Sequence, residues 1–342
     1  MILYLVRRFA TMLVTLAVIS ALVFIIINLP PGNYLSNQIA EMRATGEAAG
    51  VDKAEQLIRQ YSLDKPIWHQ YLIWLGVLPG PDGFAGLLQG NLGWSFELDR
   101  PVAEVIGETA WLTVLVNLSS LLFVYTVALP LGTIAAGRAN TWIDYLCSFL
   151  GYIGLATPNF LLALILLFYG AQYFNIPIGG LMSREYEGEP MSWGKAGSIL
   201  THLIVPTIVI GTSAAAAVMR RLRANLMDEL NKPYVETARA KGVPAVTRIV
   251  RYPLRMALNP FVADIGNLAP QLVSGSVMIS VVMSLPTVGP ILLQALKSQD
   301  IFMSGFILLF VAGLTLIGML ISDILLAMLD PRIRLSSERR GA

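Results

Sequence analysis

Few residues of this chain could carry out acid–base, metal or redox chemistry. The 342 residues include two histidines, His69 and His202, whose separation fits no metal-ligand spacing. Cys147 is the single cysteine, so neither an intrachain disulfide nor a thiolate metal cluster is possible. His202 beside Thr201 does not provide the Ser/His or paired-aspartate site that an intramembrane hydrolase needs. We therefore expect no catalytic residue, no bound metal and no redox centre.

One segment superficially resembles a phosphate-binding loop. Between Gly188 and Lys195 the two glycines are one residue too far apart, and Ala196 stands where the motif needs Ser or Thr. The chain is therefore expected to bind no nucleotide cofactor, and any nucleotide chemistry must come from a partner.

Two carboxylates, Asp264 and Asp323, lie inside long apolar runs, each near one end of its run. Carboxylates within a membrane usually mark functional sites, and a proton-coupled secondary transporter would use them. Their positions near the ends of the runs favour a structural ion pair or exposure at the membrane surface.

The composition is that of an integral membrane protein. Hydrophobic residues make up 55% of the chain and charged residues 13%, whereas soluble domains carry roughly 25% charged residues. The net charge of +2 is too small to indicate a nucleic-acid partner. A disordered chain and an ordinary cytosolic enzyme are also poor fits.

Six apolar runs are long enough to cross a bilayer, which takes about 20 residues. They are Phe9–Leu29, Trp111–Gly137, Leu146–Phe174, Ile199–Met219, Phe261–Pro286 and Ser304–Leu329. The first is longer than the core of a signal peptide and is expected to be a retained span. Prolines inside the next four runs predict kinks or hinges: Pro130, Pro158, Pro206 and Pro270.

The basic residues predict the orientation. Sixteen Lys and Arg residues fall on the side of the termini and eight on the other, so both termini are expected to be cytosolic. Nine of the sixteen lie between the fourth and fifth runs. The expected organisation is a cytosolic N-terminus with the first span (1–29), an external region (30–110), a core of five spans (111–329) containing the basic loop 220–260, and a cytosolic tail (330–342).

The external region 30–110 contains an amphipathic stretch at Val51–Tyr61, which predicts a helix. The aromatic residues that follow, Trp68, Tyr71 and Trp74, are of the kind that favours the headgroup zone. Two interpretations remain open: a small cap on the outer membrane surface, and a docking surface or gate for an external partner.

The basic loop is expected to contain a short helix with clear ends. Pro233 suits a first turn, Glu236 lies near the positive end of the helix dipole, and Gly242 is suited to cap the C-terminus. Pro244 is expected to prevent the helix from continuing. A helix of about two turns outside the membrane is suited to docking into a groove on a soluble partner.

Around this helix the sequence resembles a known family. Glu236-Thr237-Ala238-x-x-x-Gly242 is similar to the "EAA" loop (Glu-Ala-Ala-x-x-x-Gly) of permease subunits in binding-protein-dependent ABC importers. The wider stretch from Tyr234 resembles the dipeptide/oligopeptide/nickel branch. Further resemblances occur along the chain at Tyr4–Arg8, Leu63–Trp68, Gly90–Ser95, Arg100–Val102, Ser284–Gly289, Asp300 and Asp330–Arg332.

Three positions depart from the family pattern. Thr237 replaces the second alanine of the motif, and Tyr252–Arg255 keeps only the leucine of a later "I-x-L-P". Pro286–Gly289 lacks the first glycine of the usual Pro-Gly-x-Gly.

The resemblance implies an all-α integral membrane protein with six transmembrane helices, the type I ABC importer permease architecture, a cytosolic coupling helix and an extended periplasmic loop after the first helix. It implies a bacterial inner membrane location. The implied partners are a second homologous permease subunit in a heterodimer, two ABC ATPase subunits from one or two genes, and a periplasmic substrate-binding protein. ATP and Mg²⁺ would be used by the ATPase subunits.

The resemblance also implies which residues couple to the ATPases, whereas the path candidates rest on their residue types, because hydroxyls and flexible thioethers suit a path that does not bind tightly. Those expected to couple to the ATPases are Tyr234, Glu236, Thr237, Ala238, Arg239, Lys241 and Gly242. Candidates for the translocation path, with helix packing as the alternative role, are Ser274, Ser276, Met278, Ser280 and Met283. Short peptides are the favoured substrates, with nickel chelates and oligosaccharides as alternatives and a proton-coupled secondary transporter as the other class.

Overall fold

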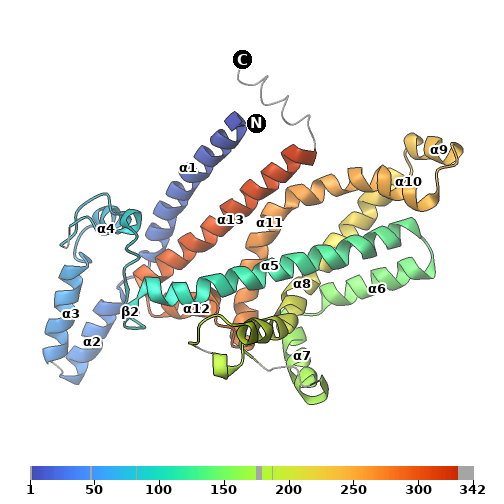
Figure 1. Ribbon diagram of the computed structural model, residues 1–342. Helices are drawn as coiled ribbons and strands as arrows, with labels where there is room; N and C mark the ends of the chain where they lie inside the picture. Colours follow the sequence, from blue (N-terminus) through green and yellow to red (C-terminus); the bar gives the residue numbers. More distant parts are fainter. Residues whose placement is uncertain (1, 47, 82, 175–178, 187, 330–342) are drawn as a thin grey trace. The chain divides into compact units, whose positions relative to one another are not determined.

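The computed structural model describes residues 2–46, 48–81, 83–174, 179–186 and 188–329, and is mostly helical over these ranges (Figure 1). The predicted tail 330–342 lies outside the described residues. The chain forms two compact units. The core unit comprises the residues up to Phe9, Leu112–Pro286 and the residues from Thr315 on, and the cap unit comprises Ala10–Trp111 and Thr287–Leu314.

The long helices coincide with predicted apolar runs. They are α1 (Ile2–Ile27), α5 (Val102–Gly137), α8 (Trp193–Leu230), α11 (Pro253–Val282) and α13 (Ile301–Leu329). In the part of the chain that the structure describes, five helices are long and apolar enough to cross a membrane, or six if a bent pair counts as one span. The all-helical, multi-span fold class is thus confirmed.

Some helices extend beyond the apolar runs that predicted them. The fourth run ends at Met219, but α8 continues to Leu230. Charged residues end the apolar run without ending the helix, because Arg and Lys are good helix formers. The start of α8 is earlier as well, where the Ser192 side chain accepts a hydrogen bond from the Lys195 backbone N–H at 3.2 Å.

The third run is two helices, α6 (Trp142–Ala156) and α7 (Asn159–Phe174), bent by 100°. The kink or hinge predicted at Pro158 is thus present as a sharp bend, and the run Leu146–Phe174 counts as one span only if the bent pair is a broken span. Pro158 lies in the break, where it lacks a backbone donor and disfavours helical angles at the residue before it. By contrast, Pro130 and Pro206 lie inside the continuous helices α5 and α8.

In the core unit, α5, α8 and α11 share a hydrophobic cluster that includes Val124, Leu222 and Phe261. The segment of α13 in this unit packs closely on α11, since a Cβ on Gly266 would lie 2.7 Å from the Met319 Cα. The Ser322 hydroxyl donates to the Val262 carbonyl at 2.8 Å across the same contact.

The cap unit is built from shorter elements. They are α2 (Tyr34–Thr45), α3 (Ala48–Gln60), α4 (Ile67–Leu75), a 3₁₀ turn (Leu87–Gln89), the antiparallel strands β1 (Trp94–Ser95) and β2 (Arg100–Pro101), and α12 (Val288–Lys297). The helix predicted over Val51–Tyr61 is confirmed as α3, which buries Ala54. A second 3₁₀ turn, Arg184–Tyr186, belongs to the core unit.

The core of the cap unit gathers apolar side chains from α1, α4, α12 and the first turns of α13. Trp74 is only 4% exposed, and its ring lies 5.3 Å from that of Phe24. The prediction that Trp74 lies among lipid headgroups is therefore wrong, whereas Trp68 is exposed.

Asp300 connects the β1–β2 hairpin to the start of α13 by hydrogen bonds. Its buried carboxylate accepts from the Ser95 hydroxyl at 2.7 Å and from the Met303 backbone N–H at 3.2 Å. Burial raises the pKa of this carboxyl, and the hydrogen bonds it accepts act in the opposite direction. Two segments of the family resemblance, at Ser95 and Asp300, thus meet in one hydrogen bond.

Candidate functional site

The predicted short helix is present as α9 (Pro233–Ala240), with Pro233 in its first turn. Gly242 follows the helix with φ = +73°, and its N–H donates to the Arg239 carbonyl at 3.0 Å. The Val243 N–H donates to the Ala238 carbonyl at 3.1 Å and completes the C-terminal cap. A Cβ on Gly242 would meet nothing within 4 Å, so the backbone angle is the reason for glycine here.

The end of α8 holds α9 in place. The Tyr234 hydroxyl donates to Glu229 Oε2 at 2.7 Å, and the Lys232 ammonium donates to Glu229 Oε1 at 2.5 Å. Val235 is the buried residue of α9. The Glu229 carboxylate therefore ties α9 to the end of α8 from two positions. The place of α9 in the fold is labelled in Figure 1.

The other side chains of α9 are available to a partner. Glu236, Arg239 and Lys241 are exposed, and within the described ranges no ion pair involves them. Thr237 is also exposed, and its hydroxyl donates to the Pro233 carbonyl at 3.0 Å. The structure thus brings the predicted coupling residues together on one small, polar element.

Sequence analysis missed a second short helix, α10 (Ala245–Arg251). As expected, the first helix does not continue through Pro244, but the chain becomes helical again directly after this proline. Val246 and Val250 lie one turn apart on α10 and are both exposed. Their four-residue spacing was the available signal for an exposed apolar stripe.

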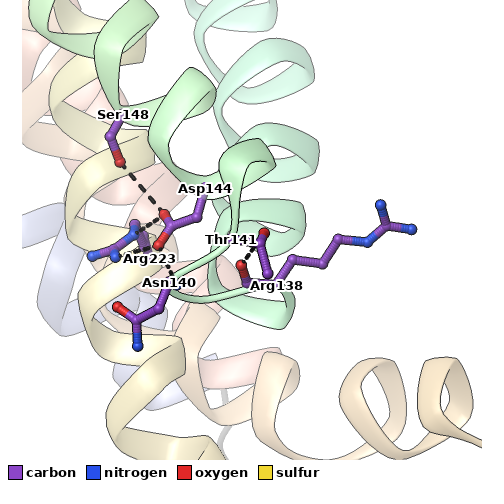
Figure 2. A network of polar contacts seen from close by, with 6 residues as sticks. All are labelled: Arg138, Asn140, Thr141, Asp144, Ser148 and Arg223. Carbon is purple, nitrogen blue, oxygen red and sulfur yellow. Dashed lines mark hydrogen bonds and ion pairs between the residues drawn. The ribbon is translucent and has the colours of Figure 1, made fainter.

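A buried ion pair joins α6 to α8 (Figure 2). The Arg223 guanidinium donates to both carboxylate oxygens of Asp144, with Nε at 2.5 Å and Nη2 at 2.7 Å. Asp144 is 1% exposed and Arg223 27% exposed. The Asn140 backbone N–H also donates to Asp144, at 2.9 Å, so the α5–α6 turn is fixed to the same carboxylate.

Asp264 and Asp323 both have cationic partners in the core unit. Arg221 Nη1 lies 2.7 Å from Asp264 Oδ2, and Arg8 Nη1 lies 3.0 Å from Asp323 Oδ2. The structural pairing that their positions favoured is confirmed. The Arg221–Asp264 pair also joins α8 to α11.

The five path candidates do not share one face of α11 and its C-terminus. Ser274 and Met278 are exposed, and with Gln271 and Val281 they form a stripe at helical spacing. The other three candidates are buried within the core unit: Ser276, Ser280 and Met283. Their burial agrees with the alternative role, which is helix packing.

The Tyr234 contact predicts a pH dependence for the attachment of α9. Burial, followed by the hydrogen bond to Glu229, raises the pKa of Tyr234 to about 12 from 10.0. A raised pKa means that the contact is fully present below pH 10 and is lost as the pH rises through about 12. The absorbance titration of the wild type minus that of Tyr234→Phe should show one tyrosine ionising near pH 12. A difference curve centred at pH 10 would contradict the contact.

The ion pairs of Asp264 and Asp323 predict that neither carboxylate carries transported protons. Asp264→Asn and Asp323→Asn should keep uptake within about threefold of the wild type, because partly exposed pairs contribute only about 0–1 kcal/mol. Uptake at fixed ATP should also be insensitive to a proton ionophore in both variants. Loss of uptake in both, together with ionophore sensitivity of the wild type, would support proton coupling instead.

The fold defines a multi-span membrane component that carries a short exposed helix, α9, next to its apolar spans. The chain belongs to the family described as binding-protein-dependent transport system inner membrane components, whose model matches residues 128–335. The N-terminal model of the same kind of component matches residues 1–119. The chain is thus a multi-pass inner-membrane permease component of a bacterial ABC transport system.

Several relatives match over almost their whole length. The oligopeptide transport system permease protein AppB of Bacillus subtilis is 31% identical over 332 residues, covering 96% of this chain and 98% of the relative. The dipeptide transport system permease protein DppB of Lactococcus lactis is 29% identical over 337 residues, covering 98% and 100%. DppB of Escherichia coli is 28% identical over 350 residues, covering 97% and 98%.

Proposed function

We propose that this chain forms half of the translocation pore of an ATP-driven importer of short peptides. The observation that carries the proposal is α9, a short capped helix that is fixed to α8 and exposes Glu236, Arg239 and Lys241. The names of the relatives, which are oligopeptide and dipeptide permeases matched over nearly the whole chain, support peptides as the substrate class.

The proposed assembly contains a second, related permease subunit, two ABC ATPase subunits and a periplasmic substrate-binding protein. Both termini and α9 lie on the cytosolic side, as the distribution of basic residues predicts. This chain binds no cofactor and has no catalytic residue, because ATP and Mg²⁺ are used by the ATPase subunits. Gln271, Ser274 and Met278 form an exposed stripe of α11 that is available to the path or to the second subunit.

In the proposed mechanism, closure of the ATPase pair moves α9 as a rigid body. Tyr234 and Lys232 pass this movement to α8 through their hydrogen bonds to Glu229, which lies at the end of α8. From α8, the Arg223–Asp144 pair transmits it to α6, and the apolar packing of α8 against α11 transmits it to α11. The spans then exchange between two arrangements, one open outward and one open inward.

The test is uptake into proteoliposomes that contain both permease subunits and both ATPases. We expect a radiolabelled tripeptide to accumulate only when binding protein and ATP are both present, and a proton ionophore to have no effect. Uptake that follows a proton gradient in the absence of the ATPases would overturn the proposal.

A further inference from the structure

The cap unit contains a groove that the proposed mechanism does not use. Residues of α2 and α3 line one side of it and residues of the β1–β2 hairpin the other, and it encloses about 540 Å³. Small-molecule sites typically enclose roughly 300–1,000 Å³. The groove combines the aromatic rings of Tyr34, Trp94 and Phe96 with the charges of Lys53, Glu97 and Asp99.

The aromatic wall of the groove is held in place by ring contacts. The rings of Tyr34 and Phe96 stack with centroids 6.4 Å apart, and the edge of Tyr61 meets Phe96 at 5.1 Å. Phe96 also contacts Phe302, which belongs to the core of the cap unit. A wall fixed in this way offers apolar surface to a ligand without the cost of ordering it on binding.

The charges of the groove are arranged by sign. Glu97 and Asp99 lie on the hairpin, whereas Lys53 lies on α3. Across the described segments none of the three forms an ion pair; the Glu97 carboxylate accepts a hydrogen bond from Gln294 Nε2 at 3.0 Å. Burial raises the pKa of Tyr34, and so do the charges of Glu97, Asp300 and Asp99, in that order, so carboxylates on and beside the hairpin give this wall of the groove a negative potential.

We propose that this groove binds short peptides that have a free α-amino group. The ammonium group lies against Glu97 and Asp99, a side chain lies on the aromatic wall, and the terminal carboxylate faces Lys53. The inference rests on the proposed function, import of short peptides, and goes beyond it by giving the permease chain its own substrate-selecting site.

The test is direct binding of trialanine to the complete importer in nanodiscs, without binding protein, by saturation-transfer NMR. Wild-type importer should bind trialanine, and N-acetyl-trialanine should bind about tenfold more weakly because it lacks the ammonium group. The Glu97→Gln, Asp99→Asn double variant should weaken trialanine binding about tenfold and abolish the preference for the unblocked peptide.

The two substitutions preserve local structure. Glutamine can still accept from Gln294, and asparagine tolerates the left-handed backbone of Asp99, where φ = +49°. The matched control is Asp52→Asn, an exposed carboxylate of α3 that does not line the groove, which should leave binding unchanged. If the double variant does not assemble, Lys53→Gln should weaken binding of trialanine but not of its C-terminal amide.

Two results would overturn the groove site. One is a double variant that binds trialanine as tightly as the wild type does. This result would overturn the site even if the double variant bound the binding protein more weakly. The other is an importer that transports trialanine with binding protein and ATP but does not bind it alone. Binding of trialanine without any transport would contradict the proposed function and leave the groove site standing.

Discussion

Replacing Gly242 by valine is expected to leave the protein in the membrane but to lower ATP-driven uptake at least about tenfold. Gly242 has φ = +73°, a backbone region that costs a residue with a β-carbon about 1–2 kcal/mol and a β-branched one more. A helix as short as α9 is marginal by itself and depends on its cap. Valine should therefore unwind the C-terminal turn of α9 and disturb its attachment to the ATPase.

The matched control is Gly242→Asn, because asparagine tolerates the same backbone angles. Space around the position is open, so asparagine should keep uptake within about threefold of the wild type. The Glu236→Lys, Gly242→Asp double variant places a positive charge near the N-terminus of α9 and a negative charge just after its C-terminus, both unfavourable to the helix dipole, and should abolish uptake. Uptake into proteoliposomes and the ATPase rate are measured together. Wild-type transport by a well-folded double variant would rule out the coupling role of α9.

Replacing Arg223 by alanine is expected to destabilise the core unit by about 3–5 kcal/mol, and replacing Asp144 by about half as much. The two effects differ because Asp144 is 1% exposed and Arg223 is 27% exposed. Removal of the arginine leaves a carboxylate without its cation and almost without water. Removal of the aspartate leaves a guanidinium that can reach solvent along its flexible stem.

The measurement is the thermal denaturation midpoint of each purified variant in detergent. Arg220→Ala is the control, because Arg220 is exposed and its guanidinium lies 5.6 Å from the centre of the Tyr152 ring. Its loss should cost about 0.5–1 kcal/mol. An Asp144→Ala variant less stable than Arg223→Ala would contradict the assignment of the asymmetry to burial.

Features formed by neighbouring residues were predictable from the sequence. The apolar runs predicted the spans, and Pro233 together with Gly242 predicted both ends of α9 to within a residue. The positive φ of Gly242 also follows from its place after a helix. Each of these features depends on residues within a few turns of one another, so the order of residue types is sufficient.

Helix ends beside charged segments were not predictable in the same way. Hydropathy locates the apolar run that ends at Met219, but the helix α8 extends beyond it to Leu230.

The prolines show a second limit. Kinks or hinges were expected at Pro130, Pro158 and Pro206 alike, but the helix breaks at Pro158 and continues through the other two. Whether a proline bends a helix depends on the packing around it.

By itself the sequence determined the class of this protein, its membrane orientation as an expectation, and the position of the helix proposed to dock on the ATPase. Only the tertiary structure paired Asp144 with Arg223, 79 residues apart, and Ser95 with Asp300, 205 residues apart. It alone also placed Lys53, Glu97 and three aromatic rings around one groove. The physical reason is that ion pairs and binding sites depend on distances in space, which are set when the helices pack and which no local pattern of residue types contains.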